Sequence, residues 1–147
     1  LYAVGDVRAT AWHPCMTPGG DRWSFPAEIS TGVDCDVAYV YSFLFKGRAT
    51  GYLSGGGTAV IGLGHGITDD SVASHPFFGT TRVIDALKDC PGFSEGRVDL
   101  LDGAYVRAAG NRYVSAIDPD RVVGPTASRT VPTMTMAVEA PLVAASA

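Results

Sequence analysis

The residues best suited to proton transfer gather in one Gly- and Asp-rich stretch of the sequence, from 62 to 74. His65 lies close to Asp69 and Asp70 there, and His75 follows directly after the stretch. A histidine beside carboxylates can act as a general base near pH 7. His65, Asp69 and Asp70 are therefore the predicted catalytic residues of an enzyme of the isomerase, cyclase or lyase type. The alternative is a solvated polar loop in which an aspartate caps a short turn.

The same stretch shares part of a dinucleotide-binding fingerprint. Gly62 and Gly64 follow an apolar run and have the G-x-G spacing, but Ile67 stands where a third small residue is needed. Asp69 and Asp70 would also repel a phosphate. Clustered carboxylates suit a hard cation as well, but a polar loop explains them equally. We therefore expect no cofactor and no metal.

Nucleophiles and soft metal ligands are sparse in this sequence. The three cysteines, Cys15, Cys35 and Cys90, show no C-x-x-C spacing, and His13 with Cys15 offers only two zinc ligands. Three reduced thiols are expected, with one disulfide and a spare thiol as the alternative. Cys90 falls at the end of a predicted helix, where the helix dipole disfavours a thiolate. Ser54 misses the G-x-S-x-G nucleophile spacing by one position.

The strongest strand pattern in the sequence runs from 33 to 46. Its apolar face after Tyr39 continues with Tyr41, Phe43 and Phe45, and the opposite face turns apolar after Asp36. Such a strand is covered on both sides. Tyr39, Tyr41 and Phe43 are predicted to form a core face, or else to line a cavity that holds an apolar ligand.

The remaining elements are short and separated by turn residues. A helix over about 80–89 is indicated by a threonine cap, an apolar stripe and the Pro91-Gly92 stop. Asp102-Gly103 and Gly110-Asn111 are good two-residue hairpin turns. Strands are predicted at 1–13, 22–30 (an edge strand, because of Pro26), 49–53, 58–63, 97–101, 104–109, 112–117 and 130–143.

These elements predict a mainly β protein, an antiparallel barrel or sandwich of about eight short strands with one short helix. An α+β fold is the second choice. The chain has 147 residues, a net charge of −4 and 18% charged residues, which fits one folded domain. The scattered arginines and lysines disfavour nucleic acid as a partner, and no apolar stretch is long enough to cross a membrane.

The C-terminal stretch suggests assembly. After a single β-rich domain at 1–130, residues 131–147 carry Glu139 as their one charged side chain and form a predicted extended arm. Such an arm can dock on a neighbouring subunit. The first functional hypothesis is therefore a structural subunit of a homo-oligomeric shell, tube or virus-like particle, with itself as partner. The second is a small β-barrel enzyme or binding protein for an apolar small molecule. The sequence gives no localisation.

Overall fold

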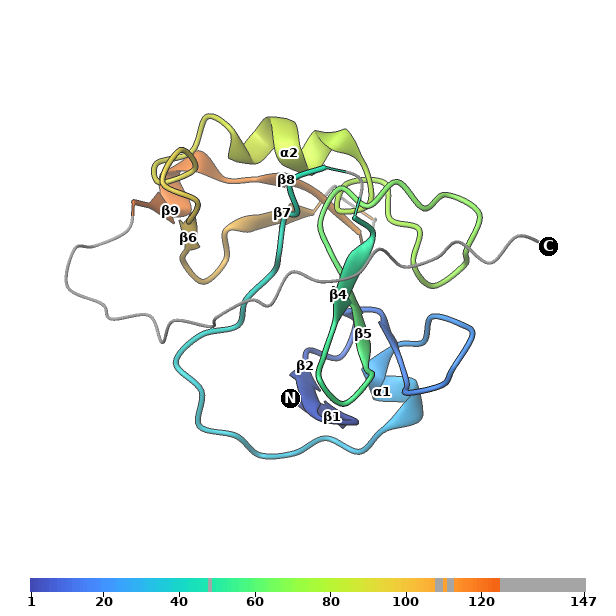
Figure 1. Ribbon diagram of the computed structural model, residues 1–147. Coiled ribbons are helices and arrows are strands. Elements are labelled where there is room, and N and C mark those ends of the chain that lie inside the picture. The colour runs from blue at the N-terminus through green and yellow to red at the C-terminus, as the bar shows by residue number, and fades with distance from the viewer. Residues whose placement is uncertain (48, 108–109, 111–112, 125–147) are drawn as a thin grey trace.

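The computed structural model describes residues 1–47, 49–107, 110 and 113–124. Within them the chain is mainly β, with nine short strands that pair antiparallel in four small sheets. Figure 1 shows two groups of elements. One group, β1, β2 and α1, lies at the bottom of the view, and the other, α2 with β6 to β9, lies at the top. The elements in chain order are β1 (Tyr2–Val4), β2 (Val7–Ala9), β3 (Cys15–Met16), α1 (Pro26–Ile29), β4 (Gly51–Leu53), β5 (Ala59–Ile61), α2 (Thr81–Leu87), β6 (Asp99–Leu100), β7 (Tyr105–Arg107), β8 (Val114–Ile117) and β9 (Val122–Val123).

The first core lies between the β1–β2 hairpin and the sheet of order β3-β5-β4. Gly5 occupies the hairpin turn with a φ of 55°, a conformation that L side chains rarely adopt. Val4, Ala9, Cys15 and Val60 form a buried cluster, and Tyr52 packs against it. Central strand β5 is buried along its whole length and has β3 and β4 as partners on its two edges.

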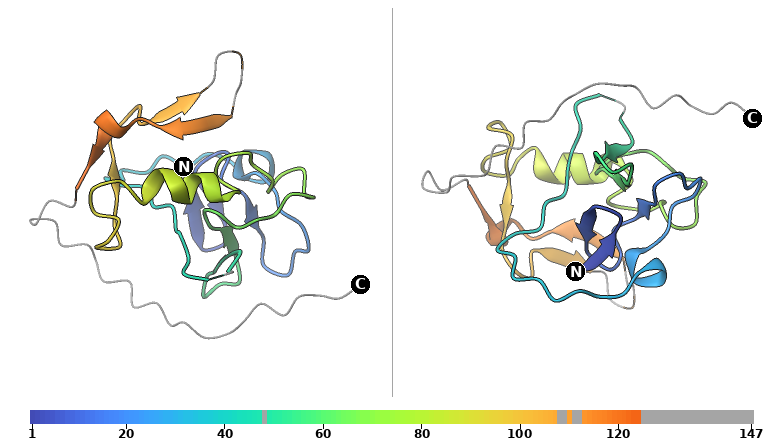
Figure 2. Two further views of the ribbon diagram at one scale, coloured as in Figure 1. Left: turned by 90° about the horizontal axis from the view of Figure 1, so that it is seen from above. Right: turned by 60° about the horizontal axis from the view of Figure 1, so that its bottom comes forward.

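The second core lies under α2. The apolar stripe of this helix packs Val83 and Leu87 against Phe77 and against Val114 of β8. Figure 2 shows β7 and β8 as a hairpin beside the helix, and these strands pair from Tyr105 to Ile117 with one irregularity in register. Each core is small. The long loops between the strands are fixed by backbone hydrogen bonds and by polar side chains that cap turns.

The fold class predicted from the sequence is confirmed, since the described chain is mainly β. The helix predicted at 80–89 is α2, and the strands predicted at 49–53, 58–63, 97–101, 104–109 and 112–117 each contain an observed strand. The single strand predicted at 1–13 is instead a hairpin of β1 and β2, because the chain reverses at Gly5. The sheets stay separate, however, and the described residues form no closed barrel. The predicted strand at 130–143 and the arm at 131–147 lie outside the described residues.

The strand predicted over 33–46 is wrong. Its pairing with other segments in the described chain is limited to two backbone hydrogen bonds between Val33 and Leu1 and a single parallel bridge between Leu44 and Leu63. A period-two pattern forms a strand only where the backbone finds a partner strand, and residues 34–42 pair with no strand of the described chain. Residues 34–42 run instead as a segment without strand structure along the outside of the molecule (Figure 1), and Tyr39 and Tyr41 are exposed rather than part of a core face.

Two further predictions fail for local reasons. The edge strand at 22–30 is replaced in part by α1, because Pro26 stands at the first helical position, where a missing N–H costs nothing. The strand at 97–101 was expected to pair through the Asp102-Gly103 turn with its neighbour. Instead β6 pairs with β9, and Arg121 donates from Nη1 to the Asp102 carbonyl at 2.9 Å, which closes that loop from outside.

The N-terminal cap of α2 gives a first testable prediction. Thr80 accepts from the Arg82 N–H and donates to the carbonyls of Pro76 and Phe77 at 3.2 Å each. Thr80→Ala is expected to lower the free energy of unfolding by about 1 kcal/mol, the usual cost of a lost cap. Urea denaturation measures this. Thr81→Ala is the matched control, and an equal loss in both variants would contradict the cap's role.

Candidate functional site

The loop predicted to be catalytic is held by its own polar side chains. Asp70 Oδ1 accepts from the backbone N–H groups of Val72 and Ala73 at 2.8 and 2.7 Å. This is the turn-capping arrangement that the sequence left open as the alternative. Asp69 is exposed. The proton-transfer role of His65, Asp69 and Asp70 remains a prediction, while the geometry gives Asp70 a structural task.

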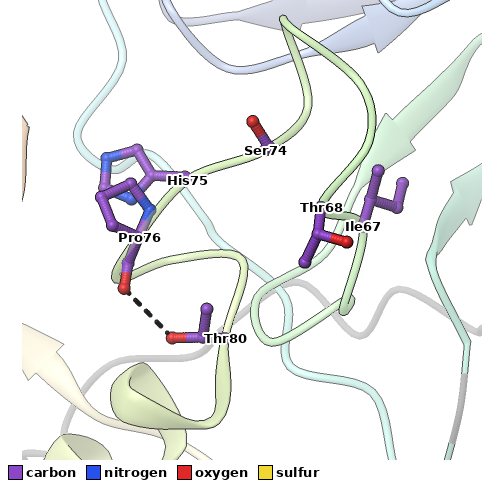
Figure 3. Close-up of a pocket in the computed structure, with 6 residues that line it drawn as sticks. All are labelled: Ile67, Thr68, Ser74, His75, Pro76 and Thr80. Carbon is purple, nitrogen blue, oxygen red and sulfur yellow. Dashed lines mark hydrogen bonds between the residues drawn. The ribbon is translucent and has the colours of Figure 1, made fainter.

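His65 and His75 are both tied to backbone donors. His65 Nδ1 accepts from the Ile67 N–H at 3.0 Å, and His75 Nδ1 accepts from Phe77 and Phe78 at 3.1 and 2.9 Å. A ring nitrogen that accepts these bonds carries no proton, so both rings are neutral with the proton on Nε2. Figure 3 shows His75 on one wall of a cavity of about 260 Å³, whose lining also includes Thr68 and Thr80 but neither aspartate.

All three histidines have a pKa below the ordinary 6.5. Burial lowers the pKa of His13 and of His65, and burial together with the charge of Arg107 and the neighbouring His65 lowers the pKa of His75. The unfolded chain then binds more protons than the folded chain in this range, so stability falls as pH drops.

This shift gives a second testable prediction. Urea denaturation at stepped pH is expected to show a plateau above the unfolded pKa of 6.5 and a loss of stability as pH falls through the lower folded values. His75→Gln should weaken that dependence by the share of one histidine, because glutamine does not titrate and His13 and His65 remain. Stability that rises on acidification through this range would contradict the shifts.

A second cavity, of about 350 Å³, lies between β1, β2, β5 and the extended segment 37–43. We call it the His13 groove. Its lining combines one histidine, an arginine and an aspartate with many apolar and aromatic side chains: Leu1, Asp6, Val7, Arg8, Ala9, Thr10, His13, Val37, Tyr39, Val40, Tyr41, Phe43, Tyr52 and Val60. Tyr39, Tyr41 and Phe43, predicted to line a cavity for an apolar ligand, thus lie around one cavity.

His13 has the geometry of a proton acceptor in this groove. It sits in the turn that leads into β3, where its N–H donates to the Thr10 carbonyl at 3.3 Å. Its Nε2 is 2.9 Å from the Ile61 carbonyl, which can only accept, so Nε2 carries the proton. Nδ1 therefore holds the lone pair. Burial lowers the His13 pKa and the bond to Ile61 opposes this only in part, so the ring is neutral near pH 7.

Cys15, two residues from His13, is not a suitable nucleophile. Its side chain is fully buried, and the thiol donates to the His13 carbonyl at 3.3 Å. Burial raises its pKa to about 11, which leaves almost no thiolate at neutral pH. All three cysteines are free in the structure.

Asp6 clamps one end of the groove. Ser54 Oγ donates to Asp6 Oδ1 at 2.5 Å, and the Gly56 N–H donates to Oδ2 at 2.9 Å. These two bonds lower the Asp6 pKa and join the β1–β2 turn to the β4–β5 turn. Ser54 also accepts from the Thr58 N–H at 3.0 Å. Ser54 is thus a buried structural hydroxyl, which agrees with its failure to match a nucleophile motif.

Sequence reasoning missed His13 as a candidate because it considered this residue only as a zinc ligand with Cys15. Its apolar neighbours Trp12 and Pro14 were a weak sign of burial. The bond to Ile61, 48 positions away, is invisible in the sequence.

In the described part of the chain no group of three or more histidine, cysteine or carboxylate residues is placed to hold a metal. No helix among the same residues is long and apolar enough to span a membrane.

Most of the chain matches a known protein family. The family model Vint, described as Hint-domain, matches residues 1–115. This range includes every residue that lines the His13 groove and the loop with His65 and His75. No curated protein matches the chain.

Proposed function

The chain belongs to the Vint family of Hint domains, and we propose that it is an acyl-transfer domain that acts on a peptide bond of its own polypeptide, with His13 as the proton-transferring residue. The observation that carries this is the neutral His13 ring in the lining of the groove, with its Nε2 bonded to the Ile61 carbonyl and its pKa lowered by burial. Near pH 7 such a ring can take up a proton and then release it.

The proposed reaction balances through His13 alone. A hydroxyl, thiol or water attacks the carbonyl carbon of the peptide bond, and its proton passes to His13 Nδ1. The imidazolium then gives that proton to the departing amide nitrogen as the C–N bond breaks. The result is an ester, a thioester or a free acid, together with a free amine, and the ring returns to its neutral form.

The groove also favours the chain's own backbone as substrate. Leu1, Thr10 and His13 all line this groove, so the start of the described chain lies at the same cavity as the histidine ring. Holding a peptide bond next to a general base replaces a collision between two molecules with an intramolecular step, which is worth several orders of magnitude in rate.

Expression of the natural polypeptide that contains these residues, tagged at both ends, tests the proposal. Intact mass and tag-specific blotting should show two fragments, with a boundary that mass spectrometry locates. The His13→Gln variant should stay uncut, and His75→Gln, altered in the other cavity, should be cut as the wild type is. A wild-type polypeptide that stays whole, or equal cutting of His13→Gln, would refute the proposal.

The sequence predicted two functions, assembly through a C-terminal arm and small-molecule enzyme chemistry, and this proposal shares features with the second. Assembly through an arm at 131–147 depends on residues outside the described ones, so it remains a prediction that light scattering tests. The enzyme hypothesis relied on His65, Asp69 and Asp70. The proposal keeps histidine proton transfer and the aromatic lining, and it moves the reaction to the His13 groove.

A further inference from the structure

Two arms of the loop between β5 and α2 are joined by backbone hydrogen bonds. The first arm is residues 64–67 and the second is residues 75–79. The N–H groups of the first arm donate to carbonyls of the second, from Gly64 to Phe78 at 2.7 Å and from Gly66 to Gly79 at 2.8 Å. Each arm carries one histidine, His65 in the first and His75 in the second.

Each histidine ring stabilises its own arm as a hydrogen-bond acceptor. Nδ1 of His65 accepts from the Ile67 N–H, and Nδ1 of His75 accepts from the N–H groups of Phe77 and Phe78. A protonated ring has a donor at Nδ1 and can no longer accept. Protonation of both rings therefore breaks three hydrogen bonds and sets N–H groups against one another, which destabilises the closed loop.

The His65 ring also contacts the opposite arm. A Cβ built at Gly79 would lie 3.0 Å from Cε1 of His65, 3.1 Å from its Nε2 and 2.9 Å from the His75 carbonyl. Gly79 thus leaves no room for a side chain, and the ring lies directly against the second arm. A change in the orientation of this ring therefore disturbs the contact between the arms.

Positive charges near the rings oppose protonation while the loop is closed. Burial, the charge of Arg107 on β7 and the charge of His65 all lower the pKa of His75, and burial lowers the pKa of His65. Arg82 of α2 donates to the Pro76 carbonyl at 3.5 Å, which brings another cation to the second arm. Two protonated rings would therefore repel each other and these arginines.

The acidic residues of the loop do not compensate for these charges. Asp69 is exposed, and Asp70 Oδ1 accepts from two backbone N–H groups of its own turn. Within the described residues no carboxylate raises the pKa of either ring. Tyr113 contacts the His75 ring edge-on, with centroids 5.2 Å apart, and a tyrosine side chain is neutral in the range where histidines titrate.

We infer that His65 and His75 form a pH-sensitive latch, which holds the two arms together while both rings are neutral and releases them when the rings are protonated. An open loop exposes the rings, which then titrate near the ordinary pKa of 6.5. Protons thus bind the open loop more tightly than the closed one, and opening becomes more favourable as pH falls below 6.5. Release widens the cavity that Ile67 and His75 line (Figure 3).

Hydrogen exchange of single backbone amides tests the latch, followed by NMR on the full chain from about pH 7 to about pH 5. The quantity compared is the protection factor, the exchange rate of an open chain at the same pH divided by the measured rate. Protection at Ile67, Phe77 and Phe78 should fall at least tenfold, since each linked proton contributes up to about tenfold per pH unit. Urea below the unfolding transition should hardly change these values, because local opening exposes little surface.

The double variant His65→Asn/His75→Asn is the matched comparison. Asparagine Oδ1 can accept from backbone N–H groups two residues on, as Nδ1 does here, but asparagine does not titrate. Protection of the three amides should then be independent of pH. His13→Gln, altered in the other cavity, should show the same fall as the wild type.

Three results would overturn the latch: a wild-type chain without the fall, a fall that persists in the double variant, or a fall that is lost in His13→Gln. Loop protection that declines with urea as steeply as global unfolding would do so too, and this measurement needs only the wild type if the double variant does not fold. None of these results depends on whether the polypeptide is cut, so the latch and the acyl-transfer proposal fail separately.

Discussion

Replacing His13 with glutamine is expected to slow processing at least about a hundredfold, the lower end of what general acid–base catalysis contributes. Glutamine keeps an N–H that can donate to the Ile61 carbonyl, the bond that His13 makes at 2.9 Å. It has no titrating nitrogen, so the proton path is lost while the local structure is kept. Quantitative blotting of a time course of the natural polypeptide measures the rate.

Comparison with His13→Ala separates chemistry from structure. Alanine removes the ring and also leaves the Ile61 carbonyl without its side-chain donor, so this variant should lose both activity and some stability. If His13→Gln retained the wild-type rate while His13→Ala lost it, His13 would be a structural residue and the proton-transfer role would be wrong.

Gly5→Ala is expected to be among the most destabilising surface-turn substitutions, by roughly 2–4 kcal/mol. Gly5 has a φ of 55°, which costs a residue with a Cβ about 1 kcal/mol or more. The new methyl group would also collide with Thr58 Oγ1. Thr58 is fully buried and bonded to the Val4 carbonyl, so it cannot move aside without breaking the contact between the hairpin and the β4–β5 turn.

Gly19→Ala is the control for this substitution. Gly19 has a φ of 71°, and a Cβ there would meet nothing within 4 Å, so only the backbone strain of about 1 kcal/mol is expected. Urea denaturation of both variants gives the difference. Equal losses would mean that backbone strain alone explains Gly5 and that the Thr58 contact is not rigid.

Local signals explain most of what the sequence predicted correctly. Thr80, the apolar stripe of α2 and the Pro91-Gly92 stop lie within one short stretch, so the helix could be placed before any tertiary contact was known. The β7–β8 pair follows the same logic, since two strands that follow each other closely in the sequence need no distant partner.

The failures come from contacts between distant residues. The segment 33–46 has the alternation of a strand, but a strand also needs a partner, and the fold brings none alongside residues 34–42 in the described chain. Likewise β6 pairs with β9 because the short 3-10 helix η1 (Pro119–Arg121) leads into β9 and Arg121 bonds to the Asp102 carbonyl. Such pairings are set by the whole fold and are not encoded in either segment alone.

In the candidate site, too, residues close in sequence could be predicted and contacts between distant residues could not. The cluster of His65, Asp69 and Asp70 was visible because its members are close in sequence, but its hydrogen bonds stay within its own loop. His13 became a candidate only when the fold brought it to Ile61 and to the aromatic wall. The aromatic residues were identified from the sequence, although as members of a regular strand, which they are not.

The rate of processing as a function of pH tests the central claim most directly. Freshly translated polypeptide would be followed in single-turnover conditions from about pH 5 to about pH 8, the range in which histidines titrate. The rate constant should rise with pH through an apparent pKa below 6.5, the ordinary histidine value, and stay level above it. The residual rate of His13→Gln should lack that step. A step that persists in His13→Gln, or a wild-type rate that falls as pH rises through this range, would contradict proton transfer by His13.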